Sequence, residues 1–245
     1  NGGNTNWTGA GYAAPAITKS TDGILFAWGG NNQSNVFCRS TDDGANWVRT
    51  SNMRTNFGVI PDGIDVPQLL PLSGGDVLVI LHDNGNRMWS KVWEKDTSYW
   101  DNGTNLTGIG TGWVDTANFD VQFGASLYAS GATTNIYLVG HTNLTAVSGD
   151  LAAFKYSDST RTWSTLAQVV DDSARQVVQG IAMVDQNTAG SIYAVYLRSS
   201  TIVGTDATNV SIYFKKSTDD GVSWGGELGP FNSYTGDYRI VRGNL

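Results

Sequence analysis

One eight-residue phrase occurs twice in this chain and constrains the fold more than any other feature. Residues 40–47 read Ser-Thr-Asp-Asp-Gly-Ala-Asn-Trp, and residues 217–224 read Ser-Thr-Asp-Asp-Gly-Val-Ser-Trp. The two final tryptophans are 177 positions apart, which is three times 59. Trp100 and Trp163 lie near the two intervening registers. Self-similarity at a fixed period is typical of repeat architectures, so the sequence predicts four units built on one plan.

Each copy of the phrase predicts a tight turn between two strands. A run rich in β-branched and aromatic residues precedes each copy, as expected for a strand. We expect Gly44 and Gly221 to adopt positive φ, and the side chains of Asp42 and Asp219 to accept backbone N–H groups within the turn. The tryptophan is expected to begin the returning strand and to bury its ring.

The two intervening copies are eroded. The copy that ends at Trp163 keeps Asp158, but Thr160 stands in the glycine place. In the register that ends at Trp100, Lys95 stands in the aspartate place. Two interpretations of that register stay open, an eroded turn or a tryptophan-bearing strand without the turn.

Three strands are expected before each turn, so each unit holds four strands in all. The runs are short, rich in β-branched and aromatic residues, and bounded by Gly, Asn and Asp, as buried strands are. The first strands are predicted at residues 14–19, 66–72, 121–128 and 178–184, and the second strands at 23–28, 76–81, 135–140 and 191–196. No convincing amphipathic helix occurs, which favours an all-β protein.

Composition argues against several classes of partner and chemistry. The net charge of −7 argues against a nucleic-acid partner. No apolar run reaches the roughly 18 residues that span a bilayer, so no membrane span is expected. The single cysteine, Cys38, is expected to be a small buried hydrophobe. His82 and His141 occupy equivalent strand ends, and we expect two separate polar residues there rather than a metal or cofactor site.

The repeated phrase resembles the Asp box, or BNR repeat, of sialidase-like β-propellers, which reads S-x-D-x-G-x-x-W. The resemblance implies an all-β propeller of four-stranded antiparallel blades, in which the box is a structural turn away from the active face. The matching box residues are Ser40, Asp42, Gly44, Trp47, Asp158, Trp163, Ser217, Asp219, Gly221 and Trp224.

We expect a single domain over residues 1–245. Its four box-bearing units are predicted at residues 12–51, 65–103, 121–170 and 178–230, and the ends close the ring or continue into further blades. The chain begins at Asn1 rather than at methionine, so we expect a processed or excised form.

The resemblance does not extend to the sialidase catalytic set. Sialidases open their first blade with a phrase similar to F/Y-R-I-P, and here residues 12–17 read Tyr-Ala-Ala-Pro-Ala-Ile. Ala13 therefore replaces the arginine that clamps the substrate carboxylate, and a methyl group cannot make that charge-assisted pair. Residues 238–241, Tyr-Arg-Ile-Val, resemble the lost phrase and carry Arg239. They are expected to form the inner strand of a further blade or closing sequence.

The predicted function is non-catalytic. We expect an extracellular, cell-surface or virion-surface propeller that acts in carbohydrate recognition, in adhesion or as a structural component, with glycans as partners and homo-oligomer or lattice contacts. The alternative is a glycoside hydrolase of sialidase type with a relocated or incomplete active site. The candidate ligand-binding residues lie near the predicted inner-strand ends or on exposed loops: Asp62, Asp65, Trp113, Asp120, Arg175, Gln179 and Arg239.

Overall fold

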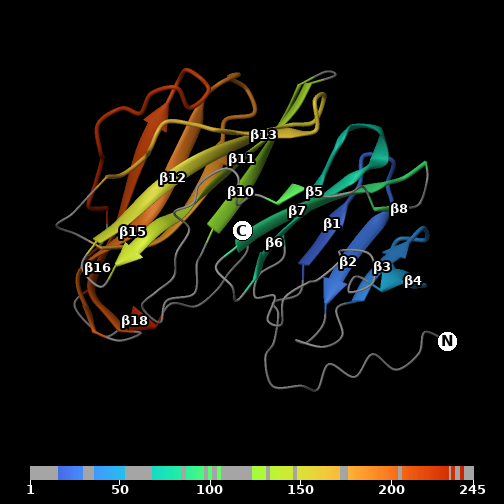
Figure 1. Ribbon diagram of the computed structural model, residues 1–245, viewed down its shortest axis with the longest axis horizontal. Coiled ribbons are helices and arrows are strands. Elements are labelled where there is room, and N and C mark those ends of the chain that lie inside the picture. Colours follow the sequence, from blue (N-terminus) through green and yellow to red (C-terminus); the bar gives the residue numbers. More distant parts are fainter. Residues whose placement is uncertain are drawn as a thin grey trace. The chain divides into compact units, whose positions relative to one another are not determined.

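The chain is built almost entirely of β-strands, as the computed structural model in Figure 1 shows. The structure describes residues 16–29, 36–52, 68–83, 87–96, 99–100, 104–105, 123–130, 133–145, 148–171, 176–203, 206–231, 233–234 and 238–239. In these residues the only helical segment is a short 3-10 turn, Ser73–Gly75, and no helix there could cross a membrane. Contacts divide the chain into two compact units, residues 1–107 and 108–243.

The first unit holds two antiparallel sheets in which the chain runs from one strand to its neighbour. The strands of the first sheet, in spatial order, are β1 (Ala16–Lys19), β2 (Leu25–Gly29), β3 (Val36–Ser40) and β4 (Val48–Asn52). Those of the second sheet are β5 (Gln68–Pro71), β6 (Val77–Asp83), β7 (Arg87–Glu94) and β8 (Tyr99–Trp100), with β9 (Thr104–Asn105) also paired to β7.

The second unit repeats this plan with longer strands. Its third sheet contains β10 (Phe123–Ser130), β11 (Thr133–Thr145), β12 (Ser148–Ser157) and β13 (Thr162–Thr165). Its fourth sheet contains β14 (Gln176–Val184), β15 (Ile192–Val203), β16 (Asp206–Ser217) and β17 (Ser233–Tyr234), with β18 (Tyr238–Arg239) also paired to β16. The prediction of four-stranded antiparallel sheets is confirmed, whereas the single domain over residues 1–245 stays a prediction.

An aromatic cluster forms the core of the first unit. The rings of Phe26 and Phe37 stack with centroids 5.4 Å apart, and the rings of Trp28 and Trp93 lie 6.4 and 5.8 Å from Phe37. All four side chains are buried. They come from β2, β3 and β7, so the core joins the first sheet to the second.

Aliphatic and tyrosine side chains form the core of the second unit. Val139 and Leu151 of the third sheet belong to the same buried cluster as Ala182, Ala194 and Tyr196 of the fourth sheet. The strand pattern explains this, because alternate residues of a strand point to one face and these faces are apolar. The third and fourth sheets therefore share one hydrophobic core.

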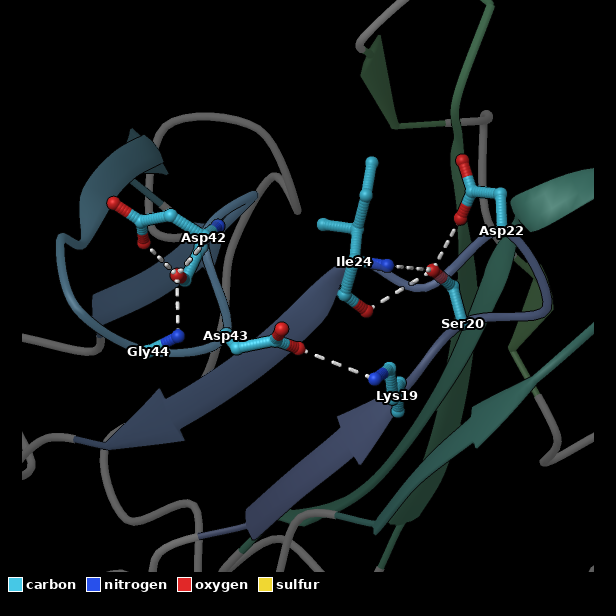
Figure 2. A network of polar contacts seen from close by, with 8 residues as sticks. Lys19, Ser20, Asp22, Ile24, Asp42, Asp43 and Gly44 are labelled. Carbon is cyan, nitrogen blue, oxygen red and sulfur yellow. Dashed lines mark hydrogen bonds and ion pairs between the residues drawn. The ribbon is translucent and has the colours of Figure 1, made fainter.

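The first repeated turn is organised by a serine hydroxyl and an aspartate carboxylate. Ser40 Oγ donates to Asp42 Oδ1 at 2.7 Å and accepts the N–H of Gly44 at 2.9 Å (Figure 2). Asp42 also accepts the backbone N–H of Asn46 at 2.8 Å and its side-chain amide at 2.7 Å. The next carboxylate, Asp43, leaves the turn and pairs with Lys19 at the end of β1 (Figure 2).

The second repeated turn has the same bonds. Ser217 Oγ donates to Asp219 Oδ1 at 2.7 Å and accepts the Gly221 N–H at 2.9 Å. Ser223 supplies its N–H and hydroxyl to the same carboxylate, as Asn46 does in the first turn. The φ angles of Gly44 and Gly221 are 92° and 83°. The expected glycine conformation and the expected aspartate hydrogen bonds are both confirmed.

The turn of the fourth sheet is held by the third sheet. Tyr137 and Lys155, which face each other across β11 and β12, both bind the carboxylate of Asp220. The second part of the contact is at the backbone, where the N–H of Ala167 donates to the Gly221 carbonyl at 3.0 Å.

The tryptophan completes this contact. Trp224 Nε1 donates to the Ala167 carbonyl at 2.9 Å. The Leu166 side chain covers Gly221 so closely that a Cβ there would lie 2.5 Å from Leu166 Cδ1. Below, Asp220, Gly221 and Trp224 are called the turn set, and Tyr137, Lys155, Leu166 and Ala167 the holding set.

The expectation that each tryptophan buries its ring and begins the next strand is wrong in part. Trp47 is 36 % exposed, and β4 begins one residue later. Trp224 is half-buried, and the residues after it make only an isolated bridge between Leu228 and Phe214 before β17 begins. Burial of such a ring depends on a neighbouring sheet, and the phrase itself does not encode that neighbour.

The eroded copies form different turns. Around Asp158, four residues connect Ser157 to Thr162, and the positive φ of 55° falls on Arg161. Asp158 pairs with Arg161. At the other register, Lys95 donates its N–H to Asp76 and pairs with Asp22 of the first sheet. The aspartate-serine arrangement is therefore not reproduced at either place.

The C-terminal phrase that carries Arg239 does not form an inner strand among the described residues. Tyr238 and Arg239 form β18, which pairs with Ala207 and Asp206 on β16. The two residues extend the far side of the fourth sheet from β14, so the first alternative, an inner strand of a further blade, is wrong for these residues, and the second, a closing sequence, stays a prediction.

Substitution of the turn glycines should separate backbone strain from packing. Gly221→Val and Gly44→Val each place a β-branched residue at positive φ, which costs on the order of 1–3 kcal/mol. We expect the larger loss at Gly221, because Leu166 leaves no room there, whereas the nearest atom to a Cβ on Gly44 is 3.7 Å away. Urea unfolding measures both, with Gly226→Ala as a control whose Cβ would meet no atom within 4 Å. Equal losses at the two sites would contradict the packing argument.

The turns should also make stability depend on acid pH. Hydrogen bonds from Asn46 and Ser40 lower the pKa of Asp42 from 3.8 to about 2, and those from Ser223 and Ser217 lower the pKa of Asp219 likewise. A lowered folded-state pKa contributes stability above pH 3.8, and this contribution is lost as pH falls through about 2. The melting temperature of the Asp42→Asn/Asp219→Asn variant should therefore fall less between pH 4 and pH 2 than that of the parent. Equal falls in the melting temperatures of variant and parent would show that groups other than Asp42 and Asp219 cause the loss of stability in acid.

Candidate functional site

Because the strands are antiparallel, the starts of the first strands and the turns after the third strands lie at opposite ends of each sheet. The first strands begin at the end where the second strands finish, as the pairs Ala16–Trp28 and Phe123–Gly140 show. The repeated turns follow the third strands and lie at the other end. The predicted ligand face is the end where the first strands begin.

Two hairpins extend past that end in the second unit. β11 continues five residues beyond Gly140, the partner of the first residue of β10, and it pairs with β12. β15 continues beyond Ser199, the partner of the first residue of β14, and it pairs with β16 as far as Val203 and Asp206. These paired extensions place further backbone beside the strand starts.

Most of the sequence-predicted site residues lie outside the described residues: Asp62, Asp65, Trp113, Asp120 and Arg175. Gln179 is on β14, beside a register shift, and Arg239 is on β18. β15 and β16 lie between these two strands, so neighbouring-strand spacing separates the two backbones by roughly 14 Å across the sheet. The register does not bring Gln179 and Arg239 together.

The histidines lie where the repeat predicts. His82 on β6 pairs with Met88 on β7, and His141 on β11 pairs with Leu151 on β12, each just past the start of the first strand. Among the residues that the structure describes, no group of histidine, cysteine and carboxylate side chains could hold a metal ion. Cys38 is half-buried on β3, and burial raises the pKa of its thiol.

A tyrosine, a glutamate and an arginine meet on the fourth sheet, which the sequence analysis missed. Tyr196 donates to Glu227 Oε2 at 2.5 Å, and Arg198 Nη1 lies 2.7 and 2.6 Å from the two carboxylate oxygens. The guanidinium of Arg198 also lies over the ring of Tyr213. Glu227 lies 31 residues after Tyr196. The pairing of β15 with β16 and the bridge between Leu228 and Phe214 bring the two together.

This cluster is built for stability rather than for nucleophilic catalysis. Burial, followed by the hydrogen bond to Glu227, raises the pKa of Tyr196, whereas a tyrosine nucleophile needs a lowered pKa. Both oxygens of Glu227 already have partners. Only two glutamates occur in the chain, Glu94 and Glu227.

A cavity of about 530 Å³ lies in the second unit at the end that carries the turns. Tyr128, Tyr137 and Asn135 line it from the third sheet, and Gly190 and Asp220 line it from the fourth. The charge of Asp220 is already matched by Lys155, and burial and the bond to Asp220 raise the pKa of Tyr137. Tyr137 and Asp220, two of the polar residues that line the cavity, therefore bind each other in the contact that holds the turn.

No family model matches this chain, and no curated protein sequence matches it. Solved structures do. An α-L-arabinanase of Penicillium chrysogenum complexed with arabinobiose matches with a TM-score of 0.60 and 16 % identity, over 91 % of this chain and 68 % of that one. A GH93 α-L-arabinofuranosidase of Fusarium graminearum, also with arabinobiose, matches with a TM-score of 0.57 and 13 % identity, over 96 % and 68 %.

A sialidase of Trypanosoma rangeli in complex with the inhibitor DANA matches with a TM-score of 0.53 and 12 % identity, over 88 % of this chain and 37 % of that one. At such identities the likeness concerns the fold. The chain has the β-propeller fold of these proteins, as the sequence predicted, and its four sheets are blades.

Loss of the Glu227 carboxylate should destabilise the protein. Glu227→Ala leaves Arg198 buried without its carboxylate, and we expect a loss of about 2–3 kcal/mol because Glu227 itself is partly exposed. Tyr196→Phe removes one hydrogen bond and should cost about 1 kcal/mol. Denaturant unfolding measures both. Unchanged stability with a loss of ligand binding or turnover would instead make this cluster a functional site.

Proposed function

We propose that this chain is a carbohydrate-binding β-propeller that does not hydrolyse the sugar it binds, and that it belongs to the Asp-box group. The fold carries the carbohydrate part of the proposal, because proteins that share it include an arabinanase, an arabinofuranosidase and a sialidase. The two serine-aspartate turns support the Asp-box assignment, because each of these hydrogen bonds of the serine hydroxyl in the first turn has an equivalent of the same length in the second.

The binding face we propose is the end where the first strands begin. The hairpins β11–β12 and β15–β16 extend beyond that end in the second unit. Trp113 offers a ring for stacking on a sugar, and Arg175 offers donors for its hydroxyl groups, in the segments before β10 and β14. Asp62, Asp65 and Asp120 precede β5 and β10 in the sequence and supply acceptors.

The absence of hydrolysis rests on the residues that such chemistry needs. Glycoside hydrolysis uses a pair of carboxyl groups, or a tyrosine nucleophile in sialidases, around an oxocarbenium-like transition state. Ala13 stands where the sialidase motif has its arginine. The Tyr196–Glu227 pair is held by Arg198 and carries a raised tyrosine pKa.

A glycoside hydrolase is the second candidate, because the fold is shared with hydrolases and aspartates precede the first strands. An extracellular or surface location accompanies both proposals, since polymeric sugars of this kind are met outside the cell.

Binding and turnover should be measured on the same preparation. We expect saturable binding of an arabino-oligosaccharide or a sialoside in calorimetry, with no release from the matching fluorogenic glycosides above buffer. Trp113→Ala and Arg175→Ala should weaken binding about tenfold each, because stacking and charge-assisted contacts are worth on the order of 1–2 kcal/mol. Ser130→Ala, in the cavity at the turn end, is the matched control and should leave binding unchanged.

Turnover well above buffer would overturn the non-catalytic proposal. If Arg239→Ala abolished that turnover, the C-terminal phrase would hold a relocated site. Absence of both binding and turnover across arabinan-derived and sialylated glycans would overturn the carbohydrate proposal itself.

A further inference from the structure

The segment that leads from the third blade to the fourth is bonded to both blades. Its described part, residues 166–171 between β13 and β14, is called the connector. Its first two residues belong to the holding set. Leu166 donates its N–H to the Ala153 carbonyl on β12, and Ala167 donates one hydrogen bond to the turn set of the fourth blade and accepts another from it. The turn end of the connector is therefore fixed by bonds to each of the two blades.

Further along, the connector is bonded to Leu151 of the third blade. Val169 and Val170 both donate their N–H groups to the Leu151 carbonyl, at 2.8 and 3.2 Å, and the Leu151 N–H donates to the Val170 carbonyl at 3.0 Å. All three side chains are buried in the core that the third and fourth sheets share. Leu151 and the connector therefore hold each other in place.

A lysine of the fourth blade binds the connector between these two points. Lys215 on β16 donates from Nζ to the Val169 carbonyl at 2.7 Å, and such charge-assisted hydrogen bonds are among the stronger ones. Val169 is 1 % exposed, so its carbonyl needs a partner inside the protein. Lys215 pairs with Ala194 of the shared core, whereas the next residue, Lys216, lies over the ring of Tyr193. The two lysines point to opposite faces because side chains alternate along a strand.

Leu151 in turn packs on the beginning of β14. A Cβ on Gly180 would lie 2.5 Å from Leu151 Cδ1, so glycine is the residue that fits there without displacing the leucine. Gly180 directly follows Gln179, and β14 has a register shift between Val177 and Gln179. A bulge interrupts the ladder and lets a strand bend, so packing against neighbouring residues determines the path of the backbone there.

We propose that Lys215 is a positioning residue for the binding face. Its bond to the connector holds Leu151 against Gly180, and this contact fixes the backbone of β14 at Gln179, one of the sequence-predicted ligand residues. The inference rests on the carbohydrate-binding function proposed above, and it adds that affinity for the sugar depends on a lysine between two blades. Every contact in this series lies within the second unit.

The binding test compares two neighbouring lysines. Lys215→Met removes the donor and keeps most of the side-chain length, and it should weaken binding of the arabino-oligosaccharide or sialoside about three- to tenfold in calorimetry. Lys215→Arg keeps a cationic donor and should retain most of the affinity. Lys216→Met removes the same charge from the other face of β16 and is the matched control, which should bind as the parent does.

A double-mutant cycle separates positioning from a general loss of stability. If Lys215 acts through Gln179, Lys215→Met should lower affinity little further once Gln179 is replaced by alanine. The effects of Lys215→Met and Trp113→Ala should instead add, because Trp113 precedes β10 in the sequence and is not part of this series. Affinity is measured under conditions in which circular dichroism shows every variant folded, so reduced stability alone does not lower it.

Hydrogen exchange tests the hold on the connector without any sugar. Lys215→Met should increase exchange at the amides of Val169 and Val170, and Lys216→Met should not. Four outcomes would overturn the proposal: parental exchange in Lys215→Met, parental affinity in that variant, an equal loss of affinity in Lys216→Met, or a loss that adds fully to that of Gln179→Ala. A parent that binds none of the glycans would overturn the proposed function instead, and the exchange comparison would then still decide whether Lys215 holds the connector.

Discussion

The serine hydroxyl at the head of each repeated turn fixes the groups on which blade contact depends. It donates to one aspartate and accepts from the turn glycine, with the same distances in both copies. This pair of bonds holds the glycine at positive φ and aims the following carboxylate and the tryptophan away from their own sheet. In the fourth blade those groups meet Lys155 and Ala167 of the third blade. Without either of the serine bonds the turn would be free to reorient. The contact between the third and fourth blades would then lose its bonds to Lys155 and Ala167.

Local features of the fold could be predicted from the sequence, because strands and turns depend on neighbouring residues. Gly44 and Gly221 take the expected φ, and the β-branched and aromatic runs at residues 23–28 and 135–140 overlap β2 and β11, although β11 extends further at both ends. Features that depend on a partner sheet could not be predicted. The exposure of Trp47 is one example, since the equivalent phrase, which differs at two positions, leaves Trp224 half-buried against the third blade.

The candidate site was harder to predict for the same reason. Glu227 and Tyr196 are 31 residues apart and meet through the register of β15 and β16 together with the bridge between Leu228 and Phe214. Arg239 lies on the outer side of its sheet, since a two-residue strand pairs with β16 rather than beginning a blade. Sequence motifs identify residue types with suitable chemistry, but convergence on a substrate is a property of strand order.

The spacing of the contact residues bears on how such a chain can change in length during evolution. The turn groups that contact the third blade, Asp220, Gly221 and Trp224, recur on the first blade as Asp43, Gly44 and Trp47, three units of 59 residues earlier. A change in length by a whole unit keeps the turns and the strand faces in phase along the chain. A change by a fraction of a unit breaks that phase. Length changes in multiples of about 59 codons are therefore the ones that this architecture accommodates most easily.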